Sequence, residues 1–431
     1  MNDEKLVRAV GVGGLTSGII NYTIGAGIFV LPAVVAARIG GAAIVAYVVC
    51  AVAMTLIVLC FAQAGSRVSL SGGAYAYAGI VFGPYVGFVV AMMLWLSNVL
   101  ASASVANIFA GTLGRFIPAA GEPMIRGAIL VALYATLAII NMRGVKIGVR
   151  VVEGFAVAKL TPLIILVVVG VFAVQAANFT WPGIPSYGEI SRTSAMLIFA
   201  FLGVESALTP SGEVRDPART VPRAVFLALG VVTLLYLAIQ TVAQGILGAE
   251  LATNTAAPLA AAARVAIGRG GEILVIAGTA ISTFGYVAGD MLAAPRGIYA
   301  LARDGLLPSP IATVHPVRRT PTVAIAVHAI ACCALAITGS FESLLVLATL
   351  ATLLVYLACC VAAFELRRRN IQTGDGVPFR IPGGPAVPVL ASAVVVWLIS
   401  SATRAEFMAL GWMMLVSTVL FFAMKASRRG D

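Results

Sequence analysis

Charge is scarce in this 431-residue sequence: Asp, Glu, Lys and Arg make up only 10% of it, against about a quarter in an ordinary soluble domain. Hydrophobic residues make up 61%, and the mean hydropathy is +1.03. A soluble core of this size needs a polar shell that 28 basic and 17 acidic residues cannot provide. The composition therefore excludes a soluble globular enzyme and predicts a helical protein that crosses a membrane several times.

Catalytic and metal-binding patterns are also missing. There are only two histidines, no His-Glu-x-x-His motif, no paired aspartates and no phosphate-binding loop, so we expect neither an enzyme nor a bound metal or cofactor. His328 lies in the predicted ninth helix, and its side chain is expected to pack against neighbouring residues. All six cysteines lie in apolar runs, which argues against a disulfide framework. The basic residues give a net charge of +11 but are scattered over short connections, so nucleic acid is not an expected partner.

Long apolar runs dominate the sequence instead. A helix needs about 20 apolar residues to cross the ~30 Å hydrocarbon core of a bilayer. The sequence contains twelve apolar runs bounded by charge, Gly or Pro: 12–36, 42–64, 84–113, 127–142, 153–176, 193–210, 221–247, 271–302, 321–338, 343–366, 387–403 and 407–425. We therefore predict an all-α membrane protein with twelve transmembrane helices, surrounded by the lipid bilayer.

The basic residues between these runs are distributed unevenly. Nineteen of them fall on the side of the N-terminus and seven on the other side. Because basic residues concentrate in cytoplasmic loops, both termini, 1–11 and 426–431, are predicted to be cytoplasmic. The first residues carry mixed charge and no small-residue cleavage site, so we expect a retained end and not a signal peptide. The expected location is a bacterial-type cytoplasmic (inner) membrane.

The spacing of the runs indicates an internal duplication. Five runs fill residues 12–176 and the next five fill 193–366, and the third run of each set is unusually long. Because five is odd, the second set begins on the opposite side of the membrane, which makes an inverted repeat; residues 387–425 add two further helices. Transporters built this way bind their substrate between the repeats, near the membrane midplane.

The first run contains a candidate break between Ile24 and Ile28. Gly25 and Gly27 each cost about 1 kcal/mol relative to Ala in a helix, and an unpaired amide in lipid costs more, so a break here needs a use. An unwound segment exposes N–H groups at the start of the following half-helix, and these favour a carboxylate. The alternative is a small-residue face that packs against a neighbouring helix.

The sixth run contains a second candidate break, at Gly203, beside the acidic residue Glu205. Carbonyl groups freed at Gly203 could accept hydrogen bonds from an ammonium group. An ionised side chain at this depth costs about 2.5–3.5 kcal/mol, so Glu205 should face protein or water and have a partner. Glu205 is either a proton-coupling residue or a structural charge that holds two helices together. Paired breaks in the first helix of each repeat indicate a binding site.

Five motifs resemble those of the amino acid-polyamine-organocation permeases, and together they span nearly the whole chain. They are GAGIF at 25–29, FLGVE at 201–205, EVRDPARTVP at 213–222, PR at 295–296 and RDGLLP at 303–308. The resemblance implies a five-plus-five inverted repeat with helices 1 and 6 broken and two extra helices. It also implies a central site between helices 1, 3, 6, 8 and 10, and transport by alternating access.

The resemblance further implies which residues hold an amino acid. The backbone around Ala26, Gly27 and Ile28 would bind the substrate carboxylate, and Phe199 would be an aromatic gate. Many relatives have Ser where this chain has Ala26, so one hydroxyl contact is absent. The residues whose carbonyls would bind the α-amino group are Ile24, Phe199, Ala200 and Leu202.

Lys159 lies inside the predicted fifth helix. An ammonium group there is costly unless it donates to carbonyls or loses its proton. In sodium-independent relatives a Lys at this place resembles a substitute for a bound sodium ion. By that resemblance Lys159 would link carbonyls near Gly25 to the eighth helix, at Ser282 or Thr283. Its protonation would then lock one state, which makes it a proton-coupling residue.

Two alternatives concern charges near Lys159. Lys159 could instead be a fixed structural charge paired with Glu153 or Asp290. Asp290, in the predicted eighth helix, could face the cavity and select cationic substrates such as lysine, arginine or a polyamine. Its structural alternative is a partial pairing with Arg296, six residues further on.

The sequence thus predicts a secondary active transporter of amino acids, with proton-coupled symport favoured. An amino acid or polyamine exchanger is the alternative, and a channel or a non-transporting membrane scaffold is a remote one. A homodimer is left open.

Overall fold

The computed structural model describes residues 10–68, 72–143, 145–179, 181, 183, 185–207, 214–373 and 377–427; for residues 118, 145–157, 206 and 207 it describes the backbone alone. Within these ranges every regular element is a helix, and a single bridge between Val10 and Val214 is the β pairing present there. The prediction of an all-α protein is confirmed. The Glu153 side chain and Glu213 lie outside this description.

The helices follow the predicted runs in order, with two of the runs divided. The first part of the chain forms α1 (Val12–Thr23), α2 (Gly27–Ile39), α3 (Ala43–Arg67), α4 (Ala74–Phe82), α5 (Pro84–Leu113), α6 (Pro123–Arg143) and α7 (Val145–Gly170). The second part forms α8 (Tyr187–Leu197), η5 (Ile198–Phe201), α9 (Val204–Ala207), α10 (Pro217–Leu247), α11 (Pro258–Ile267), α12 (Arg269–Arg303), α13 (Thr322–Thr338), α14 (Phe341–Arg368), α15 (Ala386–Ser400) and α16 (Arg404–Ser427). The predicted runs 12–36 and 193–210 are the divided ones.

Local sequence explains several of the helix starts. Proline is the first residue of four helices: α5, α6, α10 and α11. Its fixed φ and missing N–H suit this position, where the amide would have no helical acceptor. Ser186 and Glu189 form a reciprocal capping pair at the start of α8.

Seven segments of the described chain are long and apolar enough to cross a membrane. They are Gly27–Arg67, Pro84–Leu113, Pro123–Arg143, Pro217–Ala252, Arg269–Arg303, Phe341–Arg368 and Arg404–Ser427. Shorter apolar helices include Ala158–Ala173, Thr322–Thr338 and Ala386–Ser400. The protein is therefore a multi-pass helical membrane protein, while the count of twelve spans stays a prediction.

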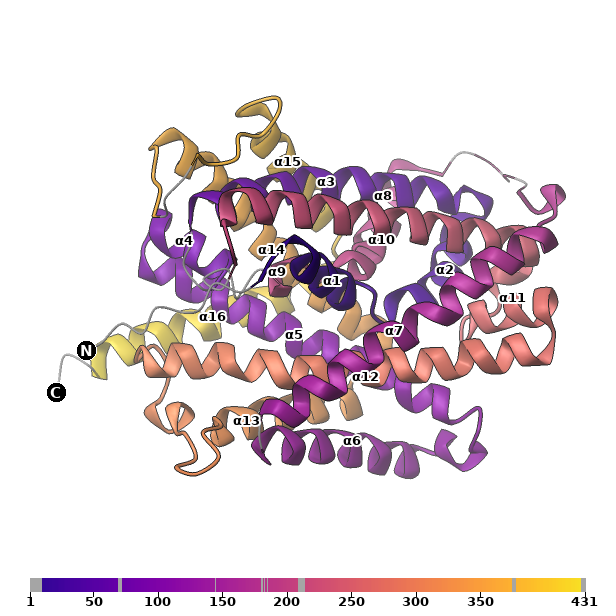
Figure 1. The fold of residues 1–431 in the computed structure, drawn as a ribbon, viewed down its shortest axis with the longest axis horizontal. Coiled ribbons are helices and arrows are strands. Elements are labelled where there is room, and N and C mark those ends of the chain that lie inside the picture. Colours follow the sequence, from indigo (N-terminus) through magenta and orange to yellow (C-terminus); the bar gives the residue numbers. More distant parts are fainter. Residues whose placement is uncertain are drawn as a thin grey trace.

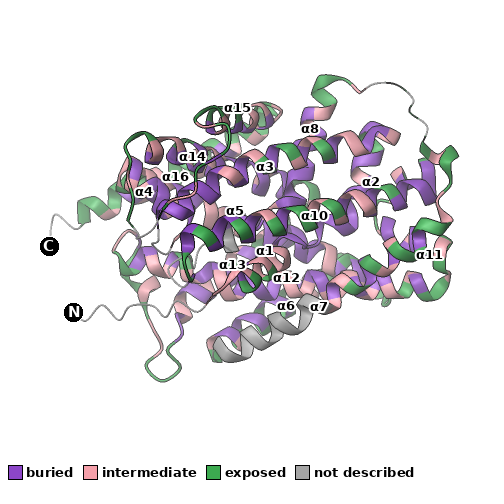
Figure 2. Cartoon of the chain, turned by 45° about the horizontal axis from the view of Figure 1, so that its top comes forward, coloured by how far each residue is buried: buried purple, intermediate pink, exposed green. Residues whose placement is uncertain are grey.

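The short helices α1 and α9 lie in the middle of the bundle, and long helices surround them (Figure 1). α1 packs against α9 and α10, α12 packs against α5 and α7, and α14 packs against α5 and α3. Over an apolar stretch of 18 residues, 72% of the residues are buried in α14 but only 17% in α16. Buried residues accordingly gather on the inner helices and exposed ones on the periphery (Figure 2). The two broken runs thus meet at the centre.

Candidate functional site

The first break separates α1 from α2, as predicted. The Gly25 N–H turns back to the Thr23 carbonyl at 2.8 Å. No backbone acceptor in the described chain reaches the N–H groups of Ala26, Gly27 and Ile28. These three donors stand at the N-terminus of α2, where the helix dipole also favours an anion. The local geometry is that of an anion-binding helix start, buried within the bundle.

The second break separates α8 and η5 from α9, also as predicted. The helix tightens at η5, which ends at Phe201, and Leu202 is then extended. Gly203 follows with φ +129°, a conformation that L side chains rarely adopt. α9 begins at the next residue, Val204. Both membrane helices that the sequence predicts to be broken are therefore interrupted.

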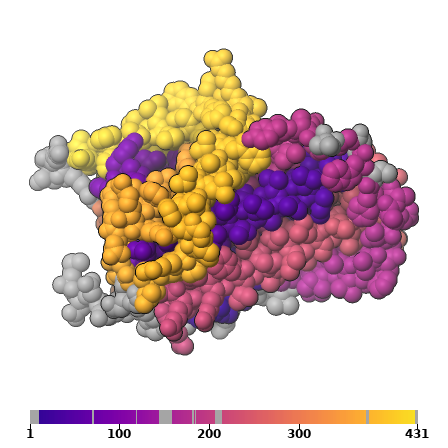
Figure 3. Space-filling view, turned by 90° about the horizontal axis from the view of Figure 1, so that it is seen from above, coloured from indigo at the N-terminus to yellow at the C-terminus, as the bar shows by residue number. Residues whose placement is uncertain are grey.

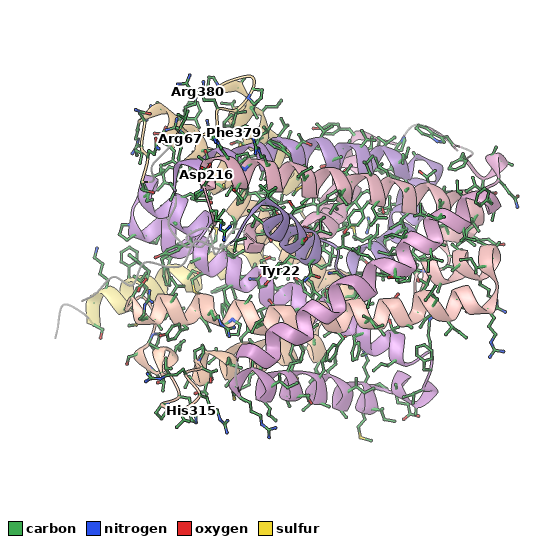
Figure 4. The ribbon with its side chains drawn as sticks, in the orientation of Figure 1. Tyr22, Arg67, Asp216, His315, Phe379 and Arg380 are labelled. Carbon is green, nitrogen blue, oxygen red and sulfur yellow. The ribbon has the colours of Figure 1, made fainter. Side chains whose placement is uncertain are left out.

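The two breaks pack backbone against backbone. A Cβ atom on Gly27 would lie 3.1 Å from the Cα of Ala200, and one on Gly203 would lie 2.8 Å from the carbonyl carbon of Tyr22. Tyr22 lies at the centre of the bundle in Figure 4. The glycines therefore lie at the helix breaks and also allow the two backbones to pack closely, so the two interpretations are compatible.

A tyrosine on α10 joins the two breaks, and sequence reasoning missed it. The Tyr236 hydroxyl lies 3.1 Å from the Thr23 carbonyl and 2.8 Å from the Ala200 carbonyl, so it can donate its proton to either. Tyr236 is fully buried. The available signal was a phenol inside an apolar run, where the hydroxyl needs a partner.

Tyr236→Phe is expected to loosen the contact between the breaks. The substitution leaves two buried carbonyls without this donor, which costs about 1–3 kcal/mol. We expect a lower midpoint of thermal unfolding in detergent and slower transport. The matched control is Tyr47→Phe, because the buried Tyr47 hydroxyl has no hydrogen-bond partner in the described chain. Equal midpoints for the two variants would contradict the role given to Tyr236.

Glu205 has partners at the second break. Its two carboxylate oxygens lie 3.0 and 3.1 Å from the Gly203 nitrogen, whose N–H donates to them, and the Tyr356 hydroxyl of α14 donates to the carboxylate at 2.6 Å. The residue is 3% exposed. Glu205 thus faces protein, ties α9 to α14, and accepts the N–H that the break at Gly203 frees.

Lys159 reaches the end of α1, near Gly25. Its Nζ donates to the Asn21 carbonyl, one turn before Gly25. Ser282 of α12 separately approaches the Gly25 carbonyl, at 3.5 Å. Thr283 donates within its own helix. In the described chain Lys159 therefore binds the first broken helix directly, and the predicted hydrogen bonds from it to the eighth helix are not formed.

Asp290 is paired with His328 and not with Arg296. The His328 Nε2 lies 2.8 Å from the Asp290 carboxylate, and Trp95 of α5 donates its indole N–H to His328 Nδ1 at 3.1 Å. Because Nδ1 must then be an acceptor, the ring carries its proton on Nε2 and donates to Asp290. His328 is therefore a buried bridge between α5 and α12, which corrects the expectation of simple packing.

The same residues raise the question of a metal site. One ligand atom each from Asp290, His328 and Cys332 lie within 4.8 Å of one another. A neutral imidazole that bound a cation through Nε2 would carry its proton on Nδ1, where it would oppose the Trp95 N–H. The Trp95 contact therefore favours a proton bond between His328 and Asp290 over a bound metal.

A hollow lies beside the start of α2. It is small, with a volume of about 10 Å³, and its walls come from α2, α11, α12 and the end of α5. Phe29 and Val30 line it, directly after the three free N–H groups, and Arg115 lies in its wall. The hollow thus borders the first turn of α2, but Ala26, Gly27 and Ile28 do not line it.

A helical bundle that packs two interrupted membrane helices at its centre has the architecture of secondary transporters. The chain belongs to the amino acid permease family, whose profile matches residues 11–426. The resemblance seen in the motifs is therefore confirmed over nearly the whole chain.

Three relatives cover almost the full length of the chain. The chain is 28% identical to the methylthioribose transporter of Bacillus subtilis (strain 168), over 97% of this chain and 94% of that protein. It is 26% identical to the branched-chain amino acid permease BcaP of the same organism, over 96% and 90%. It is also 26% identical to the serine/threonine exchanger SteT of that organism, over 98% and 98%. Family and relatives are transport proteins, which confirms that the chain is not an enzyme.

Proposed function

We propose that the protein is a secondary active transporter that carries amino acids across the cytoplasmic membrane by alternating access, with uptake coupled to protons. The observation that supports this most is the group of three N–H donors at Ala26, Gly27 and Ile28, for which the described residues supply no backbone acceptor. An amino acid supplies the anion that such donors favour. The excess of basic residues on one side supports cytoplasmic termini.

The substrate carboxylate accepts from these three N–H groups. Ala26 offers no hydroxyl, so recognition of the carboxylate depends on main-chain donors and on the dipole of α2. Main-chain donors recognise the carboxylate that all amino acids share. Selection among amino acids therefore depends on what surrounds the side chain of the substrate.

The α-amino group donates to carbonyls at the breaks. The Ile24 carbonyl accepts no hydrogen bond in the described chain, which makes it the first candidate, together with Leu202. The other two predicted carbonyls already have donors: Phe199 accepts from the Leu202 N–H at 3.3 Å, and Ala200 accepts from Tyr236. The Phe199 ring acts as the gate beside them.

Proton coupling rests on Lys159, which is 3% exposed and donates to Asn21 of α1. A charged Lys159 holds α1 against α7, and loss of the proton weakens that attachment. Glu205 is the second candidate, because its hydrogen bonds to Gly203 and Tyr356 join both sides of the site. Exchange is the alternative coupling mode, and the similarity to an exchanger supports it.

Uptake by purified protein in proteoliposomes tests the substrate class. We expect saturable uptake of a labelled amino acid, and competition by leucine, serine or lysine. Leucine methyl ester, which lacks the carboxylate, is expected to compete at least about tenfold less well than leucine, since it cannot accept three charge-assisted hydrogen bonds. Methylthioribose, which carries neither a carboxylate nor an ammonium group, should not compete.

Other results would contradict the proposal. Equal competition by leucine and its methyl ester would remove the carboxylate from recognition. Competition by methylthioribose alone would indicate a substrate that is not an amino acid. Flux that does not saturate would indicate a channel. A stronger effect of an imposed counter-substrate gradient than of a pH gradient would favour exchange over symport.

Selection of cationic substrates by Asp290 is a further part of the proposal. The carboxylate is 7% exposed and accepts from His328, so a cationic side chain would have to compete with that contact. In the same uptake assay, preference for lysine or a diamine over leucine would support this role. Equal affinities would leave Asp290 as a structural partner of His328.

A further inference from the structure

Three arginines gather at one end of the bundle, away from the helix breaks. Arg67 is the last residue of α3, Arg367 lies at the end of α14, and Arg380 belongs to the connection between α14 and α15. Arg67 donates to the carbonyl of Leu366, the residue before Arg367, and the N–H of Phe379, the residue before Arg380, donates to the hydroxyl of Ser66, the residue before Arg67. Figure 4 shows Arg67 and Arg380 near each other at the edge of the bundle. The cluster therefore places three positive charges on one small region.

Among the described residues, these arginines have no acidic partner of the kind that other arginines have. Arg38 pairs with Glu342 at 2.8 Å, for example. On α14 itself, Arg368 and Arg369 both pair with Glu365, at 2.8 and 2.7 Å. In the described chain no ion pair involves the three arginines of the cluster. Their mutual repulsion is thus not offset by an acidic side chain there.

Arg67, the most buried of the three arginines, is held by hydrogen bonds, but only some of its N–H groups take part in them. Arg67 is 5% exposed, and its Nη1 donates to the carbonyls of Leu366 and Ile371, each at 3.3 Å. Among the described residues, its Nε is buried without a hydrogen-bond partner, and so is Nη1 of Arg367. Buried guanidinium donors without partners are costly. The arrangement therefore offers donors to an acceptor that the described chain does not supply.

The connection after α14 is held over the end of α3. The Thr373 N–H donates to the Arg67 carbonyl at 2.9 Å, and the Phe379 N–H donates to the Ser66 hydroxyl at 3.0 Å. In Figure 3 this orange segment covers the end of the face on which α3 lies. These bonds fix the backbone next to Arg380, which is itself exposed. The cluster thus has a buried guanidinium group at Arg67, a partly buried one at Arg367 and an exposed one at Arg380.

We propose that Arg67, Arg367 and Arg380 bind the phosphate of an anionic phospholipid headgroup. Guanidinium groups match phosphate oxygens through paired N–H donors, and a phosphate supplies a negative charge that no described side chain brings to the cluster. The location at the end of two membrane helices suits a headgroup of the adjacent leaflet, because basic pockets between helix ends bind such lipids. Inorganic phosphate has the same chemistry, and the test separates the two sources.

Native mass spectrometry of the full chain, released from nanodiscs of phosphatidylcholine with cardiolipin, measures the retained lipid. We expect the double variant Arg367→Gln, Arg380→Gln to retain cardiolipin at least about tenfold less than the unaltered protein. Arg318→Gln is the control, because it removes a positive charge from an exposed residue on a different loop. Arg67 is left intact, since its bonds to α14 also support the fold.

A second arm uses inorganic phosphate, added to protein in detergent without anionic lipid. A rise in thermal midpoint that the double variant loses would assign the cluster to soluble phosphate and overturn the lipid source. No effect of phosphate, together with loss of cardiolipin in the double variant only, supports the proposal. Equal cardiolipin retention by the double variant and by Arg318→Gln would overturn it.

Discussion

Gly203→Ala is expected to abolish transport and to destabilise the folded protein by more than about 3 kcal/mol. At φ +129° an L side chain is strained however much space surrounds it, and at Gly203 there is no space. The added Cβ would lie 2.8 Å from the carbonyl carbon of Tyr22 and 2.9 Å from the Thr23 nitrogen. Because these atoms are backbone, relief requires the two broken helices to separate. The yield of monodisperse protein in detergent and the rate of uptake measure the effect.

Gly18→Ala is the control for this prediction. Gly18 lies in α1, and a Cβ there meets nothing within 4 Å. Alanine within a helix is favoured over glycine by about 1 kcal/mol, so this variant should be as stable as the unaltered protein or more so. If Gly203→Ala were as stable and active as Gly18→Ala, the packing of the breaks against each other would be wrong.

The helix breaks could be predicted because their signal is local. Paired glycines and a buried acid within 20-residue apolar runs are visible in the sequence and conflict with a continuous helix. The same is true of the all-α membrane fold, which follows from apolar runs and scarce charge. Run boundaries were less informative: the sixth predicted run extends from 193, whereas α8 begins at Tyr187.

The partners of the buried polar groups could not be predicted, since they come from distant parts of the chain. Tyr356 donates to Glu205 from 151 residues away, and Trp95 donates to His328 from 233 residues away. Nothing in the local sequence specifies which helices face each other at a given depth. A polar group in an apolar run therefore predicts that a partner exists, but not its identity.

His328 illustrates the consequence. As one histidine on an apolar helix it was expected to pack, whereas in the structure it bridges Trp95 and Asp290. For Asp290 the sequence suggests Arg296 as a partner, because the two lie on one helix. The actual partner, His328, lies on another helix, and proximity in the sequence does not indicate it.

Lys159→Met is expected to make uptake independent of pH while the protein stays folded. Methionine has nearly the length of the lysine stem but carries neither a charge nor a donor. The substitution removes the contact with the Asn21 carbonyl, which is the attachment of α7 to α1 that the proton would control. Hydrogen bonds within α1, and the contact of Tyr236 with Thr23, remain to support the fold. Initial rates of uptake into proteoliposomes, with and without an inward proton gradient, measure the effect.

Lys425→Met is the matched control, because Lys425 is an exposed residue near the end of α16. This variant should keep the response to the proton gradient in full. An exchange assay, in which internal substrate drives uptake at equal pH on both sides, separates coupling from substrate binding. If Lys159→Met keeps exchange but loses the proton response, Lys159 couples the proton and does not hold the substrate. An unchanged proton response in Lys159→Met would leave Lys159 as a fixed structural charge and move the coupling role to Glu205.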